Sequence, residues 1–225
     1  MSSWSMLSTY VTAVGGLGTA AFGLVDSFKA LPGGGISRAG LKFIREIIIT
    51  LTPADPGLDR SGLSRESIIH SITSQWINGV DSSDQLNIAK SQIKLRLNPT
   101  TAGDLATSTG VDAKILTNVA ASIASGTALS PQESDVYGRF DLMLTTLLDQ
   151  AYQRADQRYR NTAKVCAVPV SVALAIVAHY VLPTGTISAG AAALLGLIAT
   201  PIAPVAKDLS TAISNAVQAV QTIKG

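Results

Sequence analysis

Four cationic side chains come directly before a long uncharged stretch of the sequence. They are Arg154, Arg158, Arg160 and Lys164. Each cation beside an anionic leaflet is attracted to it by about 1 kcal/mol, and a ring of Arg and Lys biases a pore toward anions. We therefore expect this cluster to bind lipid headgroups or to line a pore mouth. The alternative is that it only provides the ordinary positive charge that sets membrane topology.

Other residue types that commonly do chemistry are sparse. His70 lies beside Ile69 and Ile72 in an apolar helical pattern, which favours a histidine in a core or at its boundary over a metal ligand. The lone Cys166 excludes an intrachain disulfide. The glycine runs at 15–18 and 33–35 lack the strand, helix and lysine of a phosphate-binding loop. We expect no enzyme, no cofactor and no metal site.

Three stretches contain no charged residue, and each is about long enough to cross a bilayer core of roughly 30 Å as a helix. They are Leu7–Val25, Val165–Leu182 and Ile187–Val205. The first has no basic residue before it and is longer than the apolar region of a signal peptide, of about 7–15 residues, so we expect an uncleaved span. The sequence thus predicts three membrane-spanning helices.

Small residues recur at helical spacing in the first predicted span. One face holds Thr12, Gly16 and Ala20, and an adjacent face holds Gly15, Thr19 and Gly23. Because packing drives helix association in lipid, such faces favour close contact with another helix, including one from another subunit. The alternative is the general tolerance of membrane helices for glycine.

The middle of the chain has amphipathic helical periodicity without convincing β-alternation. Helices are expected at 36–51, 64–77, 82–97, 101–109 and 111–125. In the first of them Leu41, Ile44, Ile48 and Leu51 recur at spacings of three and four. Ser130, Pro131 and Glu133 form a capping-box pattern that starts another helix. No Gly or Pro interrupts the chain between Arg139 and Val168, so this helix is expected to continue into the second span.

The fold class is therefore all-α, a polytopic helical membrane protein with a cytoplasmic helical domain. The expected parts are a first transmembrane helix at 1–31, the cytoplasmic domain at 36–161, a transmembrane hairpin at 162–206 and an amphipathic C-terminal helix at 207–225. Only 14% of the residues are charged, against the roughly 25% usual in soluble proteins. The positions of Lys and Arg predict a protein of the plasma membrane or the bacterial inner membrane. Its N-terminus is expected outside and its central domain in the cytoplasm.

A net charge of +2 without a dense basic stripe argues against a nucleic-acid partner. The span interiors lack the charged residues that mark ion-coupled transport paths. We therefore expect a non-enzymatic homo-oligomer in the lipid membrane that forms a pore, a channel-like assembly or a scaffold. The alternative is a membrane-tethered module whose cytoplasmic domain docks an unknown protein or small ligand.

Overall fold

The computed structural model describes residues 3–27, 35–55, 57–59, 62–181, 188–201 and 203, with side chains from Thr9 onward. Every regular element in these ranges is a helix, which confirms the all-α fold class. By contact, the chain divides into two compact units. Unit 1 comprises Met1–Ile36 and Arg160–Gly225, and unit 2 comprises Ser37–Tyr159. The predicted C-terminal helix at 207–225 lies outside the described residues.

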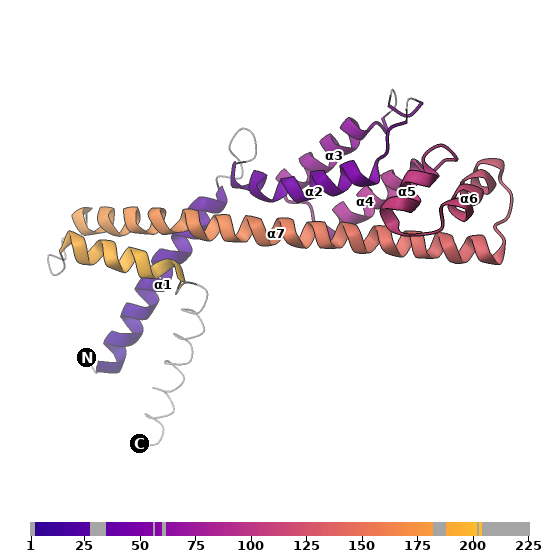
Figure 1. Ribbon diagram of the computed structural model, residues 1–225. Coiled ribbons are helices and arrows are strands. Elements are labelled where there is room, and N and C mark those ends of the chain that lie inside the picture. The colour runs from indigo at the N-terminus through magenta and orange to yellow at the C-terminus, as the bar shows by residue number, and fades with distance from the viewer. Residues whose placement is uncertain are drawn as a thin grey trace, which may run out of the picture. The chain divides into compact units, whose positions relative to one another are not determined.

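Unit 2 is built from five helices that pack beside the first part of a sixth (Figure 1). They are α2 (Arg38–Leu51), α3 (Arg65–Ile77), α4 (Ser82–Leu95), α5 (Ala102–Thr109), α6 (Ala113–Ser125) and the beginning of α7 (Pro131–Val181). These helices are the predicted ones, and their ends differ from the predicted ends by a few residues. Capping residues fix most of the observed ends. Ser64, Asp81 and Asp112 accept backbone N–H bonds at helix starts.

The helix ends in unit 2 follow local chemistry. Gly110 and Gly126 end α5 and α6 in the left-handed conformation that glycine adopts without penalty. At the start of α7 the Ser130 N–H donates to Glu133 Oε2 at 2.8 Å, and the Glu133 N–H donates to Ser130 Oγ at 3.3 Å. This confirms the predicted capping box. The Ser130 N–H also lowers the pKa of the Glu133 carboxyl by stabilising its charged form.

The core of unit 2 is formed by apolar side chains from all its helices. From α2, the predicted residues Leu41, Ile44, Ile48 and Leu51 are buried. The core also holds these buried side chains: Ile68, Ile72, Ile93, Leu105, Leu116, Val119, Phe140, Leu144 and Leu148. Gly40 allows close approach of α2 to α7, because a Cβ there would clash with the Ala155 carbonyl. Burial of these side chains supplies the main free energy that stabilises this unit.

Unit 1 contains α1 (Ser3–Ser27), the end of α7 and an apolar helix at Ala189–Pro201. In this unit Ala21 and Val25 of α1 pack against Ala167 of α7, all fully buried. Among the described residues, α7 is the one helix long and apolar enough to cross a membrane. The helix Ala189–Pro201 is apolar but shorter. The arrangement with three spans stays a prediction, and part of its third span lies outside the described residues.

Candidate functional site

The two predicted small-residue faces of α1 have different environments in the folded chain. Gly15 is buried, and Thr19 Oγ1 donates to its carbonyl at 2.9 Å. The other residues of the two faces are exposed: Thr12, Gly16, Thr19, Ala20 and Gly23. A Cβ at Gly16 or Gly23 would meet no atom within 4 Å. That these faces contact another subunit stays a prediction.

A glycine that the sequence analysis did not single out makes the close approach within the chain. Gly18 is buried, and a Cβ there would clash with the Ala199 carbonyl and fall 2.7 Å from Ala203 Cβ. The helix Ala189–Pro201 therefore packs directly against the backbone of α1. Gly18 is two residues from Gly16, so it points to a different side of α1.

A second glycine, Gly196, allows the helix Ala189–Pro201 to pack closely against α7. A Cβ at Gly196 would fall 2.6 Å from Val172 Cα and 2.7 Å from the Ser171 carbonyl oxygen. Ser171 Oγ donates to the Gly196 carbonyl at 2.6 Å and lies 2.9 Å from Thr200 Oγ1. Close backbone approach plus a hydrogen bond between hydroxyls is the packing mode of helices in lipid. The hydroxyls of Ser171 and Thr200 are thereby satisfied although both residues are buried.

The four predicted cations all lie exposed on α7. Arg154 and Arg158 belong to unit 2, one helical turn apart, and Arg160 and Lys164 belong to unit 1. The repeat of 3.6 residues puts Arg158 and Arg160 on different faces of α7. Whether they bind lipid headgroups or line a pore mouth stays a prediction.

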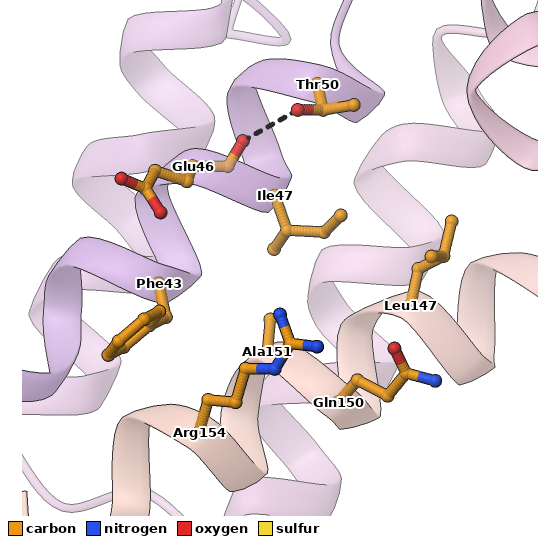
Figure 2. Close-up of a pocket in the computed structure, with 8 residues that line it drawn as sticks. All are labelled: Phe43, Glu46, Ile47, Thr50, Leu147, Gln150, Ala151 and Arg154. Atoms are coloured by element: carbon orange, nitrogen blue, oxygen red, sulfur yellow. Dashed lines mark hydrogen bonds between the residues drawn. The ribbon is translucent and has the colours of Figure 1, made fainter. Parts of the chain in front are cut away.

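A shallow pocket of about 190 Å³ lies in unit 2 between α2 and α7 (Figure 2). No pattern in the sequence predicts this pocket. From α2 it is lined by Phe43, Glu46, Ile47 and Thr50, and from α7 by Leu147, Gln150, Ala151 and Arg154. Gly40 packs on Ala155, and the pocket extends from there toward Thr50 and Leu147, so the two helices run antiparallel along it. Arg154 is the one predicted site residue that lines it.

A fully buried arginine organises the loop between α2 and α3. Arg96, with 0% exposure, donates to the carbonyls of Leu63 and of Pro53, the latter at 2.5 Å. Its partner carboxylate is that of Asp59, at 3.7 Å. These bonds hold both ends of the loop on the core. No pattern in the sequence predicts them, because the burial of Arg96 is created by the loop itself.

Asp55 strengthens the same loop. Its Oδ2 accepts from Asn98 Nδ2 at 2.7 Å, and its Oδ1 accepts from the Gly57 N–H at 2.9 Å. The Asn98 bond lowers the pKa of Asp55, since it stabilises the charged carboxylate. The arrangement is structural, because Asn98 and the Gly57 backbone donate to Asp55 within the loop and its supporting segment.

Polar side chains join α4 to α7 at the surface of unit 2. Lys94 Nζ lies 2.9 Å and Lys90 Nζ 3.4 Å from the Asp141 carboxylate. The hydrogen bond from Lys94 lowers the pKa of Asp141. Lys94 also lies 4.9 Å from the centre of the Tyr137 ring. This cluster ties two helices together without leaving a group free for chemistry.

The two histidines lie on different helices, His70 on α3 and His179 on α7. The prediction that His70 lies in a core or at its boundary is wrong, because His70 is exposed on α3. Its helix buries the face of Ile68 and Ile72, and His70 falls between these on the outer side. His179 stacks edge-on with Tyr180 at 5.0 Å. No group of three His, Cys, Asp or Glu side chains suited to a metal occurs in the part of the chain that the structure describes.

Comparisons with known proteins add nothing to this geometry. No family model, no curated protein and no solved structure matches the chain. The function is therefore inferred from the residues and their arrangement.

Proposed function

We propose that the chain is a non-enzymatic integral membrane protein that assembles with copies of itself into a pore, a channel-like assembly or a membrane scaffold. The observation that carries this proposal is the exposure of the apolar part of α7. Only 17% of its most apolar 18-residue window is buried within the chain. A core helix of a soluble protein would be mostly covered, whereas a helix in lipid keeps apolar side chains on its surface.

Individual side chains support a lipid environment for unit 1. Val165, Val177 and Val181 of α7 are 71%, 57% and 72% exposed. In the helix Ala189–Pro201, Leu194 and Leu197 are 65% and 50% exposed. Water around so many apolar groups costs about 25 cal/mol per Å² of apolar surface, and lipid removes that cost. In our proposal the chain crosses the membrane three times, with the N-terminus outside and unit 2 in the cytoplasm.

The exposed small residues of α1 support self-assembly. Packing within the chain uses the side of α1 that carries Gly18, Ala21 and Val25. Thr12, Gly16 and Ala20 stay uncovered on another side. In lipid, a face of small residues is covered best by a second helix at close approach, and another copy of the chain supplies one.

Conductance of the reconstituted protein tests the pore. We expect currents with an anion preference, because Arg154, Arg158, Arg160 and Lys164 are placed at the cytoplasmic mouth in this proposal. The double variant Arg154→Gln, Arg158→Gln should reduce that preference. The matched variant Arg38→Gln, Arg45→Gln, which removes the same charge from α2, should leave it unchanged. Silence across lipids and voltages would contradict the pore and leave the scaffold.

The second candidate is a membrane-tethered binding module, and the pocket on unit 2 favours it. A ligand that binds only the folded chain raises its unfolding temperature by mass action. We expect a screen of small metabolites against the full chain in neutral nanodiscs to contain compounds that raise the unfolding midpoint. A screen in which no compound raises the unfolding midpoint would contradict a small-ligand module.

A further inference from the structure

The pocket between α2 and α7 combines an apolar floor with hydrogen-bond donors at its edge. Phe43 and Ile47 of α2 and Leu147 of α7 are partly buried against the core, and Ala151 is buried beside them. Gln150 and Arg154 follow on α7, one turn apart. The lining extends over two turns of each helix, about 10 Å at 1.5 Å per residue. A short apolar chain can lie along such a floor.

The donors at the pocket are free to bind. Neither the Arg154 guanidinium nor the Gln150 amide has an ion-pair or hydrogen-bond partner among the described residues. In Figure 2 the guanidinium of Arg154 points toward Ile47 across the pocket. A guanidinium offers five N–H donors in a planar fork that matches a carboxylate.

The carboxylate and the hydroxyl that α2 contributes to the pocket are engaged elsewhere. The Glu46 carboxylate points away from Ile47 in Figure 2 and lies 3.7 Å from Lys42 Nζ. The Thr50 hydroxyl donates to the Glu46 carbonyl at 3.0 Å. The pocket therefore presents the positive charge of Arg154 to its occupant, which favours an anion.

From this geometry we propose that the pocket binds a small carboxylate that carries a short apolar chain. The carboxylate binds Arg154, and the chain lies on Phe43, Ile47 and Leu147. The volume of about 190 Å³ is below the about 300 Å³ of common ligand sites, so the occupant has only a few carbon atoms inside the pocket. The inference rests on the second candidate function and names its ligand class.

Hexanoate is the probe for this proposal. We expect calorimetric titration into the full chain in phosphatidylcholine nanodiscs, corrected with empty nanodiscs, to show binding with a Kd on the order of 1 mM. Arg154→Gln should weaken binding about tenfold, the effect of losing a hydrogen bond to a charged group. Arg45→Gln, which removes the same charge from an exposed position outside the pocket, should bind like the natural chain.

Two further probes separate the two parts of the ligand. Acetate lacks the apolar chain and hexanol lacks the charge, so both should bind at least about tenfold more weakly than hexanoate. The anionic group of dihexanoyl phosphatidylglycerol is a phosphodiester, so competition by this lipid would overturn the restriction to carboxylates, whereas hexanoate binding without competition would support it.

The proposal is overturned if hexanoate does not bind, if hexanol binds as tightly, or if Arg154→Gln leaves hexanoate affinity unchanged. Stabilisation by other metabolites but not by hexanoate would overturn this ligand class and leave the binding module standing. Stabilisation by none of them would contradict both.

Discussion

At the scale of single residues, two glycines on α1 have opposite environments. Gly18 is covered by the helix Ala189–Pro201, whereas a methyl group added at Gly16 would have no neighbour within 4 Å. Both residues are glycines, and they lie on either side of Leu17 in the sequence. They therefore separate packing within one chain from contact between chains.

Alanine at these two glycines should have unequal effects. Gly18→Ala forces its helix away from Ala199, and overpacking of this kind costs about 1–3 kcal/mol. Gly16→Ala meets no atom of its own chain and, because alanine favours a helix over glycine, should not lower the unfolding temperature of the dissociated chain. Thermal unfolding of the full chain in detergent, followed by circular dichroism, measures both. Equal loss of stability in the two variants would contradict the described packing.

A larger side chain at Gly16 addresses the proposed subunit contact. Gly16→Leu should reduce the mass of the assembly while the unfolding temperature of the dissociated chain stays close to that of the natural chain, because leucine separates neighbouring α1 helices. Light scattering in detergent measures the mass. An unchanged assembly mass would contradict the proposal that α1 lies in the subunit interface.

The buried Arg96 stabilises the loop between α2 and α3. Arg96→Met leaves the buried Pro53 carbonyl without its donor and removes one donor from the Leu63 carbonyl, at a cost of about 3 kcal/mol. Arg139→Met removes an arginine whose ion pair with Asp135 is exposed, and should cost less than about 1 kcal/mol. Chemical denaturation of the two variants compares the costs. A cost for Arg96→Met no larger than the control would contradict the role of Arg96 in holding the loop.

At the scale of elements, the attachment of α4 to α7 depends on pH. Because Lys94 and Lys90 lower the pKa of Asp141, this carboxylate stabilises the fold above its ordinary pKa, and the contribution is lost as the pH falls through the lowered value. The pair is about one third exposed, so we expect only about 0.5–1 kcal/mol. Asp141→Asn should therefore lower the unfolding midpoint by about 2 °C at neutral pH.

The difference between Asp141→Asn and the natural chain should shrink as the pH falls below the lowered pKa of Asp141. Asp135→Asn is the control, since its partner Arg139 is on the same helix and exposed. Thermal unfolding of the three proteins across acidic and neutral pH gives the comparison. A difference that stays constant across this range would contradict the assigned stabilisation.

The helices could be predicted from the sequence because their signals are local. The stripe of Leu41, Ile44 and Ile48 and the capping box at Ser130 act within a few residues, and the structure confirms both. The close contacts could not be predicted, because they join distant parts of the chain. Nothing within α1 distinguishes Gly18 from Gly16, and only the position of Ala199 does so.

The candidate pocket was missed for the same reason. Its lining comes from two helices about one hundred residues apart, so its form depends on how α2 lies on α7. Arg154 was predicted as a site residue from its charge and its place before an uncharged stretch. No pattern in the sequence connects its neighbours Phe43 and Ile47 with Arg154, because they lie about one hundred residues away in the chain.

At the scale of the whole molecule, the chain combines two kinds of surface. Unit 2 buries its apolar stripes in one core, although Leu95 and Leu142 on its surface stay 66% and 65% exposed. Unit 1 leaves large apolar side chains of α7 and of the helix Ala189–Pro201 exposed, and joins its helices through Gly18, Gly196 and the Ser171 hydroxyl. This contrast is the physical basis for our proposal of a membrane protein with a cytoplasmic domain.

The mass of the solubilised particle tests the central proposal most directly. The chain has a mass of 23.2 kDa, and we expect native mass spectrometry from detergent micelles to give one integer multiple of it, with the same multiple in several mild detergents. Such a result is expected for a closed homo-oligomer. A particle of 23.2 kDa in all of these detergents, or a chain that stays monodisperse in water without detergent, would contradict the account.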